Sequence, residues 1–311
     1  MIQLSIVLPC YNEEAVLPET TKRLMALVDN LCEKNKISPQ SRIWFVDDGS
    51  RDRTWQLIED CARKHNVVRG IKLSRNRGHQ NALVAGLLNA DGDAVISVDA
   101  DLQDDLGAIE SMVDAFAAGN DIVYGVRQNR KKDSFFKRFT AEAYYRMLAT
   151  MGVDLVFNHA DYRLMSRRAI EALRGYPEVN LFLRGIIPQM GYPSTSVYYD
   201  RAERYAGESK YPLRKMLSFA WQGITSFSVV PLRLITGLGL LISLGSFGVT
   251  MWVLGVRLFT NEAIPGWAST VVPIYLLGGI QLLCIGIIGE YQAKIYLETK
   301  RRPPFLVDKI L

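Results

Sequence analysis

The sequence predicts an α/β fold, with a mostly parallel sheet covered by helices on both faces, followed by an interfacial helix and two C-terminal transmembrane helices. Two observations carry this prediction. In the first 126 residues, short β-branched runs alternate with stretches whose apolar residues recur at helical spacing. Further along, no Lys, Arg, Asp or Glu occurs from 234 to 256 or from 263 to 289, and about 20 apolar residues suffice to cross a bilayer.

Five strands and four helices are expected in the first part. The strands cover 4–8, 43–46, 67–73, 94–98 and 121–126, and the helices cover 14–32, 54–65, 80–90 and 106–118. The strands are nearly continuous apolar runs, as is typical of strands buried on both faces. Ligands of such sheets bind beyond the carboxyl ends of the strands. The sequences YNEE, DDGS and DADLQDD follow the first, second and fourth strands and therefore mark the expected site.

Composition excludes a disordered chain. Of the 311 residues, 49% are hydrophobic and 22% are charged, and the mean hydropathy of +0.04 fits a soluble part joined to apolar helices. Residues 91–121 hold nine acidic and no basic side chains, whereas residues 127–215 hold 17 basic and nine acidic ones. We therefore expect the first stretch to bind cations and the second to bind anions, and we expect no nucleic acid partner.

The N-terminus lacks a basic segment followed by a long apolar core, so no cleavable signal peptide is expected and the first part should stay in the cytosol. The cysteines show neither zinc spacing nor a paired framework, which predicts free thiols in a reducing compartment. These cysteines are Cys10, Cys32, Cys61 and Cys284.

The chain is expected to divide into five parts. They are a soluble domain over 1–210, an amphipathic juxtamembrane segment over 211–230, transmembrane helices over 231–257 and 268–292, and a basic cytosolic tail over 293–311. Basic residues flank the two helices on their outer ends, which predicts both termini in the cytoplasm. Residues 134–151 fit either an interfacial helix or a helix packed on the sheet. Glycines spaced along both spans allow close helix packing, and we expect a homo-oligomer.

Asp99 and Asp101 follow the fourth strand, and Gln103 comes close behind. Two carboxylates two residues apart at a strand end can share one divalent cation. Oxygen ligands suit Mg²⁺ or Mn²⁺, which would bridge the phosphates of a nucleotide. Short acidic sequences are also common as solvated loops or helix N-caps, so the residues alone leave both interpretations open.

Asp48 is a candidate for accepting hydrogen bonds from a nucleobase or a ribose, although Asp, Gly and Ser at 47–50 are also ordinary turn residues. After the first strand, Tyr11 is a candidate for stacking on a base and Glu13 for bonding a ribose. Asn12 is expected to cap the helix that follows.

Seven sequences, taken in order, resemble a known pattern: LPCYNEE, FVDDGSRDRT, LSRNRGHQNAL, VDADLQDD, GVRQNR, DYRLMSRRAI and RAERYAGESKY. With the two apolar segments behind them, they resemble the family 2 glycosyltransferases of the GT-A fold, a Rossmann-like architecture. Within that family the chain is similar to the polyprenyl-phosphate glycosyltransferases, above all the bactoprenol (undecaprenyl-phosphate) glucosyltransferases of O-antigen glucosylation. The resemblance covers nearly the whole chain.

The resemblance implies roles for three sets of residues. The nucleoside pocket would be formed by Pro9, Tyr11, Glu13, Val46 and Asp48. Asp99, Asp101 and Gln103 fall at the metal and diphosphate positions, and Arg127, Arg204 and Lys210 fall where relatives hold sugar-nucleotide or acceptor phosphates. A metal and basic side chains would offset the repulsion between two phosphates that approach each other.

Asp161 matches the position of a catalytic base in similar proteins. The nucleophile would be an oxygen of a lipid phosphate, whose second pKa is about 6. That oxygen is already ionised near neutral pH, so Asp161 can equally serve to orient a substrate. His79, in the same region of the predicted site, is interpreted as the start of a helix.

The resemblance implies an inverting, metal-dependent transfer of glucose from UDP-glucose to undecaprenyl phosphate at the cytoplasmic face of the bacterial inner membrane. A lipid flippase and a downstream glucosyltransferase would then use the product. The same chemistry with GDP-mannose or a UDP-aminoarabinose derivative is the alternative. A processive synthase is disfavoured because the chain lacks QxxRW, and a non-catalytic nucleotide-binding scaffold because both Asp99 and Asp101 are present.

Overall fold

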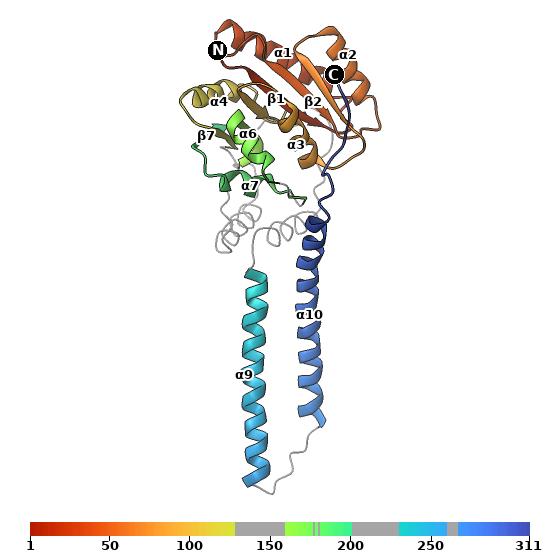
Figure 1. Cartoon of the computed structure of the whole chain (residues 1–311), viewed down its shortest axis with the longest axis vertical. Coiled ribbons are helices and arrows are strands. Elements are labelled where there is room, and N and C mark those ends of the chain that lie inside the picture. Colours follow the sequence, from red (N-terminus) through yellow and green to blue (C-terminus); the bar gives the residue numbers. More distant parts are fainter. Residues whose placement is uncertain (128–158, 177, 180, 201–229, 260–266) are drawn as a thin grey trace.

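The computed structural model describes residues 1–127, 159–176, 178–179, 181–200, 230–259 and 267–311. In these ranges the elements are, in order, β1 (Leu4–Cys10), α1 (Leu17–Glu33), β2 (Arg42–Asp47), α2 (Thr54–Lys64), β3 (Val68–Leu73), α3 (His79–Asn89), β4 (Ala94–Ser97), α4 (Ala108–Ala117), β5 (Ile122–Arg127), β6 (His159–Ser166), α6 (Arg167–Arg174), α7 (Leu183–Gln189), β7 (Ser194–Tyr199), α9 (Val230–Phe259), α10 (Trp267–Thr299) and β8 (Val307–Ile310) (Figure 1). Residues 134–151, and 211–229 of the predicted juxtamembrane segment, lie outside the described residues.

The strands form one mixed, Rossmann-like sheet in the order β7-β5-β6-β4-β1-β2-β3-β8. The pairs around β1 are parallel, as are β2 with β3 and β5 with β7. Two strands run against the rest, because β6 is antiparallel to β4 and β5, and β8 is antiparallel to β3. The prediction of a mostly parallel sheet covered on both faces is therefore confirmed.

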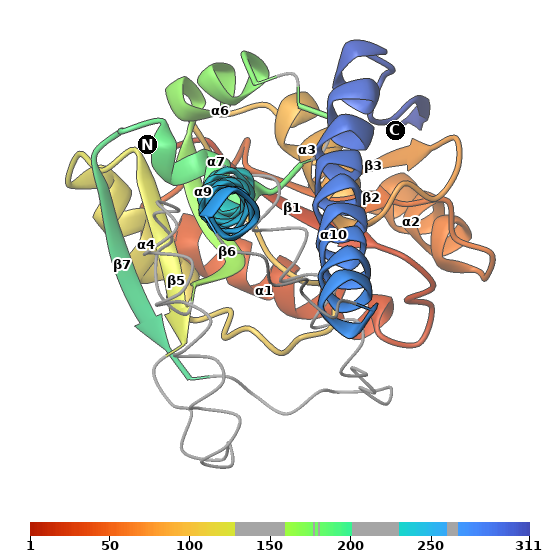
Figure 2. The same ribbon diagram turned by 90° about the horizontal axis from the view of Figure 1, so that it is seen from below.

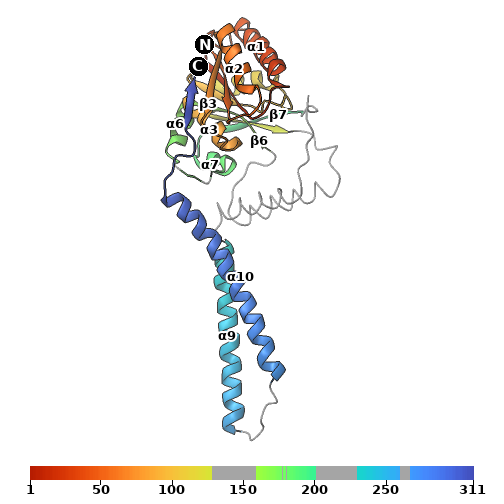
Figure 3. The same cartoon turned by 90° about the vertical axis from the view of Figure 1, so that its right-hand side faces the viewer.

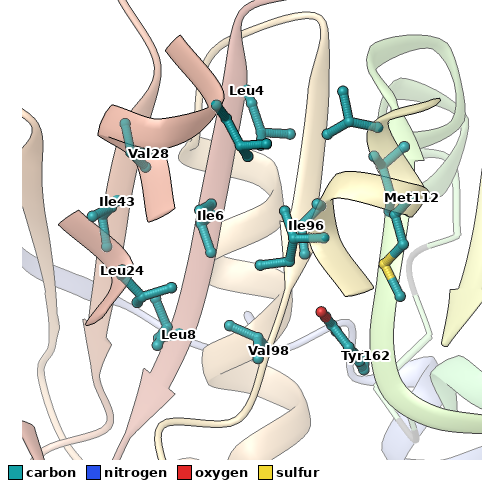
Figure 4. Close-up of a cluster of buried hydrophobic side chains, with 14 of the residues drawn as sticks. Leu4, Ile6, Leu8, Leu24, Val28, Ile43, Ile96, Val98, Met112 and Tyr162 are labelled. Carbon is teal, nitrogen blue, oxygen red and sulfur yellow. The ribbon is translucent and has the colours of Figure 1, made fainter. Parts of the chain in front are cut away.

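Strict alternation along β1 explains how helices come to cover both faces. Leu4, Ile6 and Leu8 point into the hydrophobic core under α1, α2 and α4 (Figure 4). Val7 points into a second core, shared with α3, α6 and α7. Since successive side chains of a strand point to opposite faces, a continuous apolar run buries both of them. A Cβ on Gly86 of α3 would lie 2.3 Å from a Val7 methyl, so α3 requires glycine there.

Two long helices, α9 of 30 residues and α10 of 33, lie where the transmembrane helices were predicted. Figures 1 and 3 show both leaving the same side of the α/β domain, and Figure 2 looks at that side along them. In the parts of the chain that the structure describes, no helix combines the length and the apolar character needed to cross a membrane. The spanning assignment is therefore not supported here.

The C-terminal residues return to the α/β domain, which the sequence analysis did not predict. Strand β8 pairs with the edge strand β3, and the Leu311 N–H donates to the Gly70 carbonyl at 2.8 Å. The Leu311 side chain packs against the core under α1 and α2. A domain ending at residue 210 therefore leaves out one strand of the sheet.

Candidate active site

The loops after β1 and β2 are tied together at the carboxyl edge of the sheet. Asn12, whose φ is +57°, donates its N–H to Ser50 Oγ at 3.0 Å and accepts the Arg51 N–H at 2.9 Å. The Glu13 N–H donates to Thr54 Oγ1 at 2.8 Å. This arrangement leaves the side chain of Tyr11 exposed at the sheet edge. The prediction that Asn12 caps the next helix is wrong, because the N-cap of α1 is Val16.

Pro9 and Val46 lie side by side as register partners in β1 and β2, and both are buried. Proline has no N–H to donate to a ladder. Pairing between β1 and β4 ends at Val7 and Ser97, and the Val98 N–H still reaches the Val7 carbonyl. The next donor of β1 on that side would be residue 9, so Pro9 stands where the two strands part and the site begins.

Asp48 is almost fully buried and receives two backbone donors from the loop between β3 and α3. The N–H groups of Arg77 and Gly78 donate to its two carboxylate oxygens at 2.7 and 2.8 Å. Burial raises the pKa of Asp48, and these donors oppose the rise. The loop passes so close that a Cβ on Gly49, where φ is +67°, would lie 2.5 Å from the Asn76 nitrogen. Asp48, predicted to bind nucleotide, thus holds this loop in place.

The acidic loop after β4 carries Asp99, Asp101 and Gln103. Leu102 has a φ of +58°, and the Gln103 N–H donates to Asp101 Oδ1 at 3.2 Å. Burial raises the pKa of Asp99 to about 6. His79 opposes that rise, and the nearby carboxylates of Asp104, Asp161 and Asp101 add to it. Asp99 therefore sits in a cluster of negative charge, although its side chain remains 37% exposed.

Asp161 of β6 faces the same edge but is held by arginines. Arg163 Nη2 donates to Asp161 Oδ1 at 2.6 Å, and Arg184, near the start of α7, reaches both carboxylate oxygens at 3.3 Å. Burial alone raises the pKa of Asp161, but the charges of Arg184 and Arg163 outweigh it and hold that pKa well below its ordinary value. A carboxylate stabilised so strongly in its ionised form is a weak base.

His79 joins the two carboxylates. It is the first residue of α3, as predicted, but its Nε2 also lies 3.6 Å from Asp99 Oδ1 and 3.7 Å from Asp161 Oδ2. The start of helix α3, the end of β4 and the start of β6 thus converge at this edge. The sequence places His79 at a helix start near the expected site, but nothing in the local sequence brings residues 79, 99 and 161 together.

Arg127, at the end of β5, is held by Tyr199 and Asp104. The Tyr199 hydroxyl donates to Asp104 Oδ1 at 2.5 Å and accepts from Arg127 Nε at 3.2 Å. Arg127 Nη2 lies 3.4 Å from the same Asp104 oxygen. Tyr199 was not predicted, because only the pairing of β5 with β7 brings residue 199 to this edge. Asp104 belongs to DADLQDD but was given no role of its own. Arg204 and Lys210 lie outside the described residues.

The oxygen atoms of Asp99 and Asp101 suit a divalent cation, but they would supply only part of its ligands. Among the residues that the structure describes, no group of three or more His, Cys, Asp and Glu side chains is arranged to hold a metal ion. Asp99 and Asp101 are two hard oxygen donors in an acidic loop. A cation bound there would need further oxygen ligands from a phosphate or from water.

Known proteins place the chain in a family. The glycosyl transferase family 2 model matches residues 5–174. The chain is 51% identical over 311 residues to an uncharacterized glycosyltransferase, YkoT, of Bacillus subtilis (strain 168), covering 98% of this chain and 91% of that protein. It is 38% identical over 310 residues to the SfII prophage-derived bactoprenol glucosyl transferase of Shigella flexneri, covering 99% of this chain and 98% of that protein.

Among solved structures, mannosyltransferase PcManGT from Pyrobaculum calidifontis, in complex with GDP-Man and Mn²⁺, is similar with a TM-score of 0.44. Its sequence identity is 17%, and the match covers 95% of this chain and 85% of that one. The family model spans the strands that carry the acidic loop and Asp161, and the two relatives match nearly end to end. The chain belongs to glycosyl transferase family 2 and is a glycosyltransferase.

Proposed function

We propose that the protein transfers glucose from UDP-glucose to undecaprenyl phosphate, with inversion at the sugar carbon. One observation carries the proposal: the acidic loop at Asp99 and the arginine-bound Asp161 meet at one sheet edge, both within 3.7 Å of His79. The site therefore offers negative charge for a cation beside positive charge for phosphates. The 38% identity to a bactoprenol glucosyl transferase supports this choice of donor and acceptor.

Asp99, Asp101 and Gln103 would hold Mg²⁺ or Mn²⁺ together with the donor diphosphate. A cation held by these residues would supply positive charge beside the departing UDP. Asp99 contributes as a ligand only when it is ionised, and its pKa of about 6 leaves it mostly ionised at pH 7. Tyr11 and Glu13, at the open end of β1, would contact the nucleoside, and Pro9, Val46 and Asp48 would form the floor of that pocket.

Asp161 acts in this proposal as an orienting residue. An acceptor phosphate is already ionised near pH 7, so no strong base is required. Asp161 accepts from Arg163 and Arg184 and so fixes the direction of the Arg184 guanidinium. In the transfer, a phosphate oxygen bonds to the anomeric carbon, and the bond from that carbon to UDP breaks with its electron pair leaving on UDP.

Arg127 would bind a phosphate of donor or acceptor. Its side chain is 29% exposed at the sheet edge while Tyr199 and Asp104 hold it from behind. Such support lowers the entropy lost when a long side chain is ordered around a ligand. Arg204 and Lys210 are proposed to add positive charge, on the sequence alone.

Attachment to the cytoplasmic face of the bacterial inner membrane completes the proposal. It rests on the absence of charged residues from 234 to 256 and from 263 to 289, and on the basic residues that flank them. Both termini would be cytoplasmic. A homo-oligomer is proposed on the glycines spaced along the two apolar segments. A lipid flippase and a downstream glucosyltransferase are proposed as partners on the family resemblance.

The test is transfer itself. Membranes containing the full chain are incubated with labelled UDP-glucose, undecaprenyl phosphate and Mg²⁺, or with EDTA in place of the metal. We expect labelled lipid in the first reaction and none in the second. Absence of lipid-linked glucose in both would refute the proposal. Parallel reactions with GDP-mannose and a UDP-aminoarabinose derivative test the alternative donors, and an alkaline wash of the membranes tests attachment.

A further inference from the structure

The last turn of α10 touches a loop that leads into the site. Both carboxylate oxygens of Glu298 lie 3.0 Å from the Val179 nitrogen, whose N–H they accept. A carboxylate at the C-terminus of a helix opposes the helix dipole. Burial raises the pKa of the neighbouring Glu178, and the charge of Glu298 raises it further. The position of Glu298 is therefore unfavourable for the stability of α10, and it places the carboxylate where it accepts the Val179 N–H.

Val179 lies five residues before Arg184, the arginine that reaches both oxygens of Asp161. Between them, the Leu183 N–H donates to Gln80 Oε1 at 3.3 Å. Gln80 follows His79 directly in α3. The loop that receives Glu298 is thus joined both to the arginine and to the helix that carries His79.

The same C-terminal segment also contacts the loop between β3 and α3. Just before β8, the Leu306 carbonyl accepts the Ser74 N–H at 2.9 Å. Ser74 begins the loop whose Arg77 and Gly78 bond to Asp48 and which ends at His79. Figure 3 shows the chain running from the top of α10 into β8 beside β3.

We propose that residues 298–311 are a positioning clamp, in which Glu298 positions the backbone at Val179 ahead of 181–184, and Leu306, just before β8, positions the 74–78 loop. The clamp fixes the distance between Arg184, His79 and the acidic loop, and it ties that geometry to α10. Glu298 acts through the Val179 N–H, five residues before Arg184, so its role is to position Arg184. The kinetic part of this proposal rests on the proposed function, whereas the structural part does not.

Three substitutions at Glu298 distinguish the effect of its side-chain length from the effect of its charge. Glu298→Gln keeps an oxygen at the same reach, whereas Glu298→Asp keeps the charge on a shorter side chain and Glu298→Ala removes both. We expect hydrogen exchange at the Val179 amide and in 181–184 to rise roughly tenfold in the Asp and Ala variants and to stay near wild type in Gln, because a lost hydrogen bond leaves that loop open more often. Glu171→Ala, an exposed glutamate paired with Arg174, is the matched control and should change nothing.

For the full chain in membranes, kcat of glucosyl transfer should fall roughly tenfold in the Asp and Ala variants, with the KM for UDP-glucose within about twofold of wild type. Unchanged exchange in Glu298→Ala, or equal losses in the Gln and Ala variants, would overturn the clamp. Deletion of 307–311 should raise exchange in the 74–79 loop, and its failure to do so would overturn the β8 arm. Absence of transfer by the wild type counts against the proposed function only, since the exchange measurements still decide the clamp.

Discussion

Asp99 and Asp161 are two carboxylates of one site, and their surroundings shift their pKa values in opposite directions. Both lie within 3.7 Å of His79. Burial and neighbouring carboxylates raise the pKa of Asp99 to about 6, whereas two arginines hold the pKa of Asp161 well below its ordinary value. Such a separation assigns different tasks to chemically identical groups. Asp99 is suited to gain a cation, and Asp161 to keep arginines in place.

The largest expected effect comes from removing the carboxylates of the acidic loop after β4. Asp99→Asn and Asp101→Asn should each lower the rate of glucosyl transfer roughly a thousandfold, since several kcal/mol of charge stabilisation are lost with the cation. The assay is labelled transfer at saturating UDP-glucose, with Mn²⁺ titration by calorimetry. Asp114→Asn, an exposed acid paired with Lys36, is the control. Variants with wild-type activity would remove the metal from the proposal.

On the arginine side, Asp161→Asn and Arg184→Ala should each reduce kcat by roughly tenfold to a hundredfold, the equivalent of charge-assisted hydrogen bonds worth about 1.5–3 kcal/mol. Because the two groups act on each other, the double variant should lose little more than either single one. A loss of several orders of magnitude in Asp161→Asn alone would instead favour proton abstraction by Asp161.

A smaller effect is expected from the support behind Arg127. Tyr199→Phe removes the hydroxyl that bonds Asp104 and Arg127 and leaves the ring in place. We expect transfer to fall about fivefold, mainly through a higher KM for a phosphate-bearing substrate, because one hydrogen bond contributes about 1 kcal/mol. A Phe variant with unchanged KM and kcat would show that Arg127 does not need this support.

The smallest expected effect is a change with pH in the stability of the metal-free protein. The folded protein binds the Asp99 proton more tightly than the unfolded chain does, because the pKa is raised in the folded state. The contribution of Asp99 to stability is therefore present below about pH 4 and is lost as the pH rises through about 6. With the side chain 37% exposed, the loss should be about 1 kcal/mol.

Thermal unfolding in EDTA between pH 4 and 7 measures this change. Asp161 contributes in the opposite sense, since its lowered pKa makes it stabilising above its unfolded value. Asp99→Asn should abolish the fall in stability toward pH 7 and leave the acid limb unchanged. The same fall in Asp99→Asn would assign it to another group.

Much of the α/β domain could be predicted because its signals are local. The runs at 4–8, 43–46 and 94–98 are apolar on both faces, and all three became central strands. Strands β1 to β4 are parallel neighbours, so their carboxyl ends lie at the same edge of the sheet. The three polar sequences that follow these strands therefore come together there. The roles assigned to all the predicted site residues, the metal positions and Asp161 included, stay predictions.

Strand β8 could not be predicted, since VDKI is short, exposed and half charged. It becomes a strand because the edge of β3 offers unpaired backbone groups, and a tail tethered by α10 can reach them. Tyr199 was missed for a similar reason: its strand pairs with β5, which is more than 70 residues away in sequence. Contacts of this kind depend on the path of the whole chain.

The sequence by itself determined the first five strands, the polar loops that follow three of them, and the family that the chain resembles, because periodicity and motifs are encoded within a few residues of each other. Only the tertiary structure decided that Asp161 is bound by two arginines, that His79 lies between two carboxylates, and that the C-terminus closes the sheet. Those properties depend on distances between residues far apart in the chain. The effects of burial and charge on a side chain depend on these distances, which are set only when the chain folds.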